Sequence, residues 1–295
     1  MKREEIVPSG ERALLVVVGP TASGKTDLAI ELAERLGGEV VSADSVQIYE
    51  RFDIGSGKPT REERARAEHH LIGVVDPLAP MDAARFAEMA DRAIETIRAR
   101  GRVPIVCGGT YLWVKALVHG LAEAAPRDDE IRARHTRIAE ERGRGFLHEE
   151  LQRLDPEAAA RLAPNDLVRV SRALEIHELT GKPMTEWHKA HGFATSRYDA
   201  RLIGVRRARE EIDVRIETRA KRWLESGWIE EVERLLADGY GPSRAMGSVG
   251  YREVRSFIEG RLAREDLLPT IVRSTRVFVR RQRTWLRDEP VEWLD

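Results

Sequence analysis

An apolar run followed at once by a glycine-rich loop constrains the fold of this chain more than any other feature. Residues 13–19 read ALLVVVG, and residues 19–26 read GPTASGKT. The apolar run predicts a strand that is buried on both faces, as in a parallel sheet covered by helices. The loop fits the pattern G-x-x-x-x-G-K-[ST], and helical periodicity starts at Lys25. This strand–loop–helix context predicts a phosphate-binding loop.

Further apolar runs predict the rest of the core. Strands are expected at residues 39–43, 71–76, 103–109 and 201–207, and helices at 25–36, 82–100 and about 111–118. This alternation is typical of a doubly wound α/β sheet. Residues 120–196 show helical periodicity only. We therefore predict a P-loop NTPase-like parallel-sheet core, residues 1–119 and 200–295, with an all-helical domain inserted at residues 120–199.

Composition excludes several classes of protein. The chain has 295 residues, of which 42% are hydrophobic and 34% charged, and no apolar run approaches the roughly 20 residues that span a bilayer. Its first residues, MKREEIVPSGER, lack the apolar core of an export signal, so we expect a cytoplasmic protein. Cys107 is the only cysteine, which excludes an internal disulfide. We expect no membrane partner and a monomer.

A net charge of −1 gives no sign of nucleic-acid binding, but the charge is unevenly distributed. Residues 267–287 contain no acid and six arginines: Arg273, Arg276, Arg280, Arg281, Arg283 and Arg287. Such a segment is either a basic face for RNA or an ordinary solvated helix surface. Composition alone does not separate the two.

The phosphate loop predicts a diphosphate ligand without naming the compound. Its backbone N–H groups and the helix N-terminus form an anion site, Lys25 adds a positive charge, and Thr26 is the expected Mg²⁺ ligand. Asp76 is a weak second metal ligand, because Pro77 follows it and an Asp-Pro turn explains it equally well. The predicted diphosphate-binding residues are Gly19, Thr21, Ala22, Ser23, Gly24, Lys25 and Thr26.

A carboxylate and a hydroxyl are expected beside this loop. Asp44 follows the second strand and Thr110 the fourth, and ligands of open α/β sheets bind outside these carboxyl ends. A carboxylate near a diphosphate is repelled by it, which favours a role for Asp44 as a general base over a turn cap. Thr110 either reaches the site or caps the next helix. The alternation of Ser45, Gln47 and Tyr49 predicts one face that meets a planar substrate.

These residues leave several functions open. A P-loop kinase of nucleosides or small molecules would use the same loop, and a nucleotide-switched RNA-binding protein would explain the basic segments. A prenyltransferase of free adenine nucleotides is a third alternative. The arginine-rich C-terminal segment and the helical insertion disfavour the kinase, and ATP becomes the weaker interpretation of the loop.

Seven motifs in order and spacing carry a resemblance to a known family. They are GPTASGKT (19–26), DSVQIY (44–49), DIGSGKP (53–59), GGTYLW (108–113), PNDLVRVSRALEI (164–176), GYRE (250–253) and TRVFVRRQRTWLR (275–287). Together they resemble the tRNA dimethylallyltransferase family in its bacterial form, over nearly the full chain.

The resemblance implies an activity and a site. Such enzymes transfer a dimethylallyl group from dimethylallyl diphosphate to N6 of the adenine 3′ of the anticodon, in tRNAs that read U-initial codons, with Mg²⁺ as cofactor. The family's catalytic positions fall on Asp44 as base, Thr110 at the extruded nucleotide and Arg219 at the pyrophosphate, with Arg215 as the alternative. The anticodon arm is expected to contact Asp44, Ser45, Val46, Gln47, Thr110, Arg132, Arg169, Arg172, Gly250, Tyr251, Arg252, Arg280 and Arg281.

Overall fold

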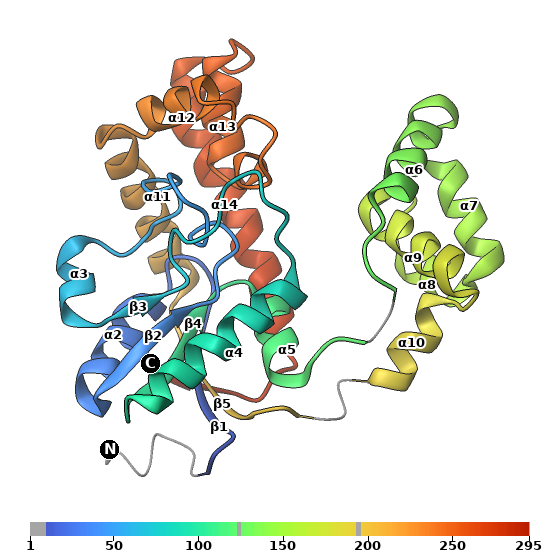
Figure 1. Cartoon of the computed structure of the whole chain (residues 1–295). Helices are drawn as coiled ribbons and strands as arrows, with labels where there is room; N and C mark the ends of the chain where they lie inside the picture. Colours follow the sequence, from blue (N-terminus) through green and yellow to red (C-terminus); the bar gives the residue numbers. More distant parts are fainter. Residues whose placement is uncertain (1–9, 123–124, 193–195, 295) are drawn as a thin grey trace. The chain divides into compact units, whose positions relative to one another are not determined.

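The computed structural model describes residues 10–122, 125–192 and 196–294 (Figure 1). The chain divides into two compact units, residues 1–118 with 197–295, and residues 119–196. The second unit interrupts the first in sequence. The predicted insertion, residues 120–199, begins one residue later and ends three residues later than this unit.

The first unit contains a six-stranded sheet in which every neighbouring pair is parallel. In space the strands follow the order β3-β2-β4-β1-β5-β6. Their bounds are β1 Ala13–Val18, β2 Gly38–Ser42, β3 His69–His70, β4 Val103–Gly108, β5 Asp199–Val205 and β6 Val291–Leu294. The carboxyl ends of β1, β2 and β4, where ligands of such sheets bind, therefore share one edge.

Helices surround this sheet. The bounds are α2 Lys25–Leu36, α3 Arg61–Arg66, α4 Ala83–Ala99, α5 Tyr111–His119, α11 Arg209–Glu225, α12 Trp228–Ala237, η1 Ala245–Gly247, α13 Tyr251–Ile258 and α14 Arg264–Leu286. The apolar stripe of α2 packs on alternate residues of the central strands, among them Leu15, Val17 and Ile105. This packing fixes the start of α2, and with it the phosphate loop, at the end of β1.

Two strand predictions were wrong. Residues 71–76 were expected to be a strand, but Leu71 and Gly73 have φ of 61° and 62°, which a strand cannot contain. Only Val75 forms an isolated bridge, to Tyr49, and the strand of this region is the short β3. The edge strand β6 was missed because four half-exposed residues give too short a pattern.

The second unit is helical throughout its described residues. Its helices are α6 Asp129–Arg142, α7 Arg144–Leu154, α8 Pro156–Arg161, α9 Leu167–Thr180 and α10 Met184–His191. Leu147, Leu151 and Val170 belong to its own apolar core. Asp128, Asp155 and Asp166 accept hydrogen bonds from the first-turn N–H groups of α6, α8 and α9, and so act as N-caps. In neither unit do the described residues include a helix long and apolar enough to cross a membrane.

Candidate functional site

The phosphate loop connects β1 to α2 through a tightly folded backbone. Ala22 and Gly24 have φ of 67° and 96°, and the positive φ of Ala22 is uncommon for a residue with a side chain. A Cβ at Gly19 would lie 2.7 Å from Ser23 Oγ, so this position requires glycine. Ser23 Oγ is buried and has no hydrogen-bond partner among the described residues. The loop thus keeps an unsatisfied hydroxyl beside the first N–H groups of α2, which have no acceptor within the helix.

Side chains from helices α11 and α14 and from the segment between β5 and α11 hold the backbone of this loop. Thr21 N–H donates to Gln282 Oε1 at 2.8 Å, Arg215 Nε donates to Ala22 O at 2.9 Å, and Arg207 Nε donates to Ser23 O at 3.3 Å. Gln282 also donates to Gly109 O at 3.0 Å and is buried. Sequence reasoning missed these contacts, because no local pattern links positions more than 170 residues apart.

Asp44 and Thr110 follow the carboxyl ends of β2 and β4, and both bind the turn that begins at Ser45. Asp44 Oδ1 accepts from Val46 N–H at 2.9 Å and Gln47 N–H at 3.2 Å, so the expected alternative of a turn cap is real. The second oxygen, Oδ2, has no hydrogen-bond or ion-pair partner among the residues that the structure describes. Thr110 Oγ1 accepts from Ser45 N–H at 3.0 Å and donates to Ser45 Oγ at 3.2 Å. Its hydroxyl serves this turn and does not cap α5.

The two glycines before Thr110 allow close approach between parts of the protein itself. A Cβ at Gly108 would lie 2.1 Å from Ala43 O, and one at Gly109 would lie 2.6 Å from Gln282 Nε2. Because Gly108 has no side chain, the end of β4 packs directly against the end of β2. Because Gly109 has none, there is room for the Gln282 side chain. Larger residues would separate the two strand ends that carry the polar groups.

The expected substrate-facing alternation of Ser45, Gln47 and Tyr49 was wrong. Residues 45–48 form turns, so their side chains do not alternate as in a strand. Tyr49 is 1% exposed and lies in the core. Gln47 uses its side-chain amide within the protein: Oε1 accepts from Ser42 Oγ at 3.0 Å, and Nε2 donates to Gly57 O at 2.9 Å. Gln47 thereby holds residues 53–59 against the end of β2.

One pocket joins the phosphate loop to Asp44, and we call it the Asp44 pocket. Its lining mixes polar residues of the loop and the strand ends with apolar residues. Its cavity volume is about 20 Å³, within a wider space of about 310 Å³ that includes open solvent. The lining residues are Lys25, Thr26, Val40, Ser42, Asp44, Gln47, Pro59, His69, Ile72, Cys107 and Gly108. Sequence reasoning missed Pro59, His69 and Ile72. The motif DIGSGKP (53–59) was a signal for Pro59, and no motif pointed to His69 or Ile72.

Two cations lie within electrostatic reach of Asp44. Burial lowers the pKa of Lys25, while the nearby Asp44 carboxylate favours its charged form. Burial likewise lowers the pKa of Arg219 to about 10, and Asp44 again opposes the shift. Burial raises the pKa of Cys107 to about 12, so this thiol stays protonated and is no nucleophile. Lys25 therefore brings one positive charge into the pocket beside the Asp44 carboxylate, and Arg219 adds a second from outside the lining.

Arg219 and Arg215, one turn apart on α11, occupy different environments. The Arg219 guanidinium lies 4.6 Å from the centroid of the Trp223 ring and interacts with Asp44. Arg215 instead donates to the loop carbonyl of Ala22 and lies 3.9 Å from Glu211. Arg219 thus faces the strand-end carboxylate, and Arg215 holds the loop from outside.

The expected RNA contacts fall into three groups. Arg280 and Arg281 are exposed on α14, as an RNA-binding surface requires. Arg252 and Arg169 are also exposed, but each pairs with a neighbour, Glu253 at 2.7 Å and Asp166 at 3.2 Å. The third group, Arg132 and Arg172 of the helical unit, both bind the buried Glu175.

Direct RNA contact by Gly250 and Tyr251 was a wrong prediction. Tyr251 is completely buried and donates to Glu231 Oε1 at 2.6 Å. A Cβ at Gly250 would lie 2.3 Å from the Trp228 ring, which packs against it. The motif GYRE therefore closes the core between α12 and α13, and of its residues only Arg252 has an exposed side chain.

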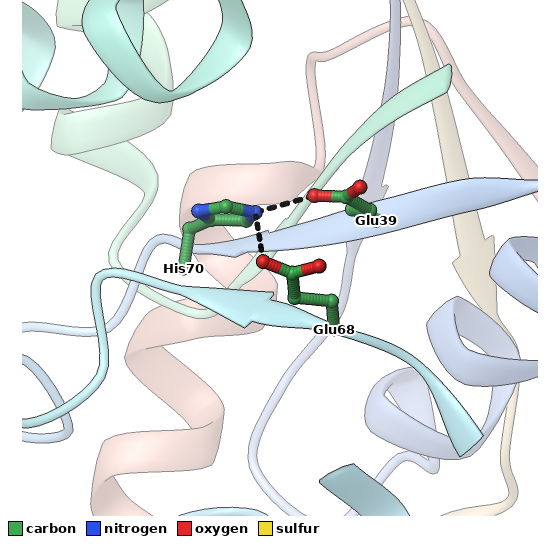
Figure 2. A group of neighbouring side chains, drawn as sticks. All are labelled: Glu39, Glu68 and His70. Atoms are coloured by element: carbon green, nitrogen blue, oxygen red, sulfur yellow. Dashed lines mark hydrogen bonds and ion pairs between the residues drawn. The ribbon is translucent and has the colours of Figure 1, made fainter. Parts of the chain in front are cut away.

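A cluster of Glu39, Glu68 and His70 has metal-ligand atoms close together (Figure 2). His70 Nε2 lies 2.7 Å from Glu39 Oε2 and 3.8 Å from Glu68 Oε1. Glu39 is buried at the start of β2, and the guanidinium groups of Arg100 and Arg102 also pair with it. Two positive groups already neutralise this carboxylate, so the cluster does not suit a cation.

Asp76 was considered as a second metal ligand, with an Asp-Pro turn as the alternative. Its Oδ1 accepts from Leu78 N–H at 2.8 Å, which is the turn.

The fold and the site define a phosphate-loop α/β protein in which a lysine and a carboxylate line one pocket and an arginine interacts with that carboxylate. The family described as "IPP transferase" matches residues 47–289, and the one described as "Isopentenyl transferase" matches residues 12–73. These matches and the relatives below show that the chain belongs to the IPP transferase family.

Close relatives and solved structures agree with this assignment. The tRNA dimethylallyltransferase of Sorangium cellulosum is 65% identical over 291 residues, which are 99% of this chain and 93% of that protein. The one of Myxococcus xanthus is 47% identical over 94% of this chain and 90% of that protein.

Among solved structures, the tRNA isopentenylpyrophosphate transferase of Bacillus halodurans is 36% identical with a TM-score of 0.71, over 97% of this chain and 90% of that one. A eukaryotic dimethylallyltransferase acting on tRNA is 27% identical with a TM-score of 0.79, over 96% of this chain and 73% of that one. The predicted P-loop-like fold is thereby confirmed.

Proposed function

We propose that this protein is a tRNA dimethylallyltransferase that prenylates N6 of the adenine 3′ of the anticodon. The observation that carries the proposal is the Asp44 pocket. It unites phosphate-loop residues, apolar residues and a carboxylate of which one oxygen has no partner within the described part of the chain. Membership of the IPP transferase family supports the same activity. As in the family resemblance, the substrates are tRNAs that read U-initial codons.

The reaction needs a base because an adenine amino group is a weak nucleophile. N6 attacks C1 of the dimethylallyl group, the C1–O bond breaks, and its electron pair leaves with pyrophosphate. The N6 proton goes to Asp44, whose Oδ2 is available while Oδ1 stays bound to the turn. The adenine must leave its stack to reach the pocket, as other reacting bases do.

The leaving group gains negative charge as the C1–O bond breaks. Lys25, Arg219 and the N–H groups at the start of α2 would oppose that charge, and preorganised groups of this kind are a large source of rate enhancement. Arg219 is our choice over Arg215, because Arg215 is already bound to Ala22 O. Thr110 would hold the extruded nucleotide through the turn that it shares with Ser45.

A magnesium ion fits the donors on this side of the pocket. The Thr26 hydroxyl lines the pocket together with the phosphate loop, and Mg²⁺ prefers oxygen ligands from a side chain plus substrate phosphates. We infer that Thr26 would hold the ion and that the ion would neutralise part of the pyrophosphate charge. The cluster of Glu39, Glu68 and His70 is no alternative, because Arg100 and Arg102 pair with it.

The choice of prenyl donor follows from the apolar residues in the lining. Val40, Pro59 and Ile72 suit a short branched hydrocarbon, and the loop suits the attached diphosphate, so we infer dimethylallyl diphosphate as the donor. We further infer a monomer that acts in the cytoplasm, where unmodified tRNA is found.

A nucleoside or small-molecule kinase was the alternative enzyme. The family match and the named relatives do not favour it.

The proposal is tested by incubating the protein with Mg²⁺, labelled dimethylallyl diphosphate and unmodified tRNA that reads U-initial codons. We expect label in the RNA, located at N6 of the adenine 3′ of the anticodon. The matched control is the same tRNA with guanosine at that position, which should take up no label. Absence of label from every tRNA tested, with phosphate transfer from ATP to a small molecule, would replace the proposal by the kinase.

A further inference from the structure

A second pocket lies beside the phosphate loop and shares no lining residue with the Asp44 pocket. We call it the Arg206 pocket, and its volume is about 230 Å³. Its lining residues are Pro20, Val205, Arg206, Arg207, Ile212, Arg283 and Trp293. Val205 ends β5 and Trp293 is near the end of β6, so the pocket opens at the ligand-binding edge of the sheet.

The lining of this pocket is strongly cationic. It contains three guanidinium groups and no carboxylate. Arg207 pairs with Glu211 at 3.3 Å outside the lining, and Arg283 Nη2 donates to Arg207 O at 3.1 Å. The Arg206 side chain is exposed and has neither a hydrogen bond nor an ion pair within residues 10–122, 125–192 and 196–294. Three like charges around one cavity repel one another, and an anion in the cavity would relieve that repulsion.

An aromatic ring and the available room narrow the class of anion. The Trp293 ring packs against Gly204, where a Cβ would lie 2.7 Å from it. This contact fixes a flat indole at the cavity, and indole rings stack on nucleobases. A volume of about 230 Å³ is several times the roughly 30 Å³ that a water molecule occupies in the liquid. A phosphate with part of its nucleotide therefore fits, and guanidinium groups recognise phosphate through paired N–H donors.

We propose that the Arg206 pocket binds a backbone phosphate of the RNA substrate, at a nucleotide other than the one that reacts. The inference rests on the proposed function, since it takes tRNA as the substrate. Arg207 connects the two sites, because its Nε donates to Ser23 O of the phosphate loop. A phosphate held here anchors the RNA beside the loop while the adenine enters the Asp44 pocket. Free phosphate ions share this chemistry, and the experiment separates the two sources.

The test is equilibrium binding of unmodified tRNA across a series of salt concentrations, without prenyl donor. Arg206→Ala should weaken binding about threefold to tenfold and lower the slope of log K against log salt by about one, because one phosphate contact is lost. Arg206→Glu should weaken it further. The matched control is Arg209→Ala, an exposed arginine at the start of α11 that does not line the pocket and should leave binding unchanged.

A second arm measures binding of inorganic phosphate by calorimetry in the Lys25→Ala background, where the phosphate loop is impaired. Unchanged RNA affinity and salt slope in Arg206→Glu would overturn the proposal. If phosphate binding then still depended on Arg206, the pocket would be a site for free phosphate.

The outcome is separable from that of the proposed function. An inactive protein that binds tRNA through Arg206 refutes the enzyme activity alone. An active protein whose Arg206→Glu variant binds tRNA like wild type refutes the Arg206 pocket alone.

Discussion

Asp44 and Glu175 are both carboxylates with two cations nearby, and they differ in how completely those cations are used. Glu175, in the helical unit, is fully buried and accepts on both oxygens. Arg132 donates to both at 2.9 and 2.8 Å, Arg172 donates to Oε2 at 2.6 Å, and Asp128 N–H donates to Oε1 at 2.7 Å. Asp44 accepts two backbone bonds on one oxygen and, among the described residues, none on the other.

The difference separates a structural carboxylate from a reactive one. Burial acts to raise the pKa of Glu175, but the bonds from Arg132 and Arg172 outweigh it and hold this pKa at about 2. Because both oxygens of Glu175 already accept hydrogen bonds and its pKa is low, Glu175 does not take up a proton near neutral pH. Asp44 keeps an open oxygen in a pocket with Lys25 and Thr26, which a proton acceptor needs. Cations around Glu175 should therefore affect stability, and those around Asp44 should affect rate.

Among the cations, the largest effect is expected at Arg219. Arg219→Ala should lower the single-turnover rate of prenyl transfer about 10³-fold, since one charge that opposes the leaving pyrophosphate is lost. The matched control is Arg215→Ala, one turn earlier on α11, which should cost no more than about tenfold because it removes a contact to the loop and ion pairs with Glu211 and Asp27. Equal losses in the two variants would contradict the division of roles between them.

The next effect concerns the stability of the helical unit. Glu175→Ala should destabilise it by about 3 kcal/mol, because Arg132 and Arg172 lose their buried partner. Hydrogen exchange of helices α6 and α9 in the full chain measures this loss. Asp44→Ala, the comparison variant, should leave exchange in these helices unchanged. A Glu175 variant with normal hydrogen exchange and a strongly reduced transfer rate would contradict the conclusion that Glu175 is structural and Asp44 reactive.

The same cluster predicts an acid limit. The folded pKa of Glu175, about 2, is below its ordinary 4.5, so the unfolded state binds more protons between these values. The contribution of Glu175 to stability is thus complete above about pH 4.5 and is lost as the pH falls toward 2. Hydrogen exchange should show the helical unit opening over this range, and Glu175→Gln should remove that part of the pH dependence. If hydrogen exchange in Glu175→Gln kept the pH dependence of wild type, the opening in acid would be due to groups other than Glu175.

A smaller effect is expected at Gln282, which joins the phosphate loop to the turn before Thr110. Gln282→Ala removes the acceptor of Thr21 N–H and the donor to Gly109 O, and should lower kcat about tenfold. Gln282→Glu keeps the acceptor but places a buried negative charge against Gly109 O, and should lower kcat at least as much as Gln282→Ala. A fall in tRNA affinity without a change in kcat would contradict a positioning role.

The smallest effect per residue is expected on the surface of α14. Arg280→Ala and Arg281→Ala should each weaken tRNA binding a few-fold, in a way that high salt abolishes, since both are exposed and contribute through phosphate contacts. The matched control is Arg264→Ala, at the start of the same helix. Salt-independent losses, or equal losses in the control, would assign the arginine-rich segment to packing.

What the sequence could predict was local. The phosphate loop was readable because strand, glycines, lysine and helix follow within 24 residues, and Asp44 because a buried strand precedes it. The i,i+3 spacing of Arg172 and Glu175 is visible in the sequence. Arg132 also binds Glu175, but it lies 43 residues away, and no local pattern indicates that contact. Such contacts depend on how helices pack, which periodicity does not encode.

Long-range packing also explains the errors. Tyr251 belongs to the motif GYRE and was predicted to contact RNA. Its hydroxyl instead donates to Glu231 of a different helix, and the residue is buried. The left-handed residues Leu71 and Gly73 broke an apolar run that looked like a strand. The Arg206 pocket was not predicted at all, because its residues come from four separate segments of the chain.

The central claim is that Asp44 takes the proton from adenine N6, and single-turnover transfer by Asp44→Asn tests it most directly. Asparagine keeps an oxygen for the N–H groups of Val46 and Gln47 but removes the basic oxygen. We predict a rate about 10²- to 10⁴-fold lower, with a tRNA Kd within about threefold of wild type. A rate within tenfold of wild type, or equal losses of rate and affinity, would contradict the claim.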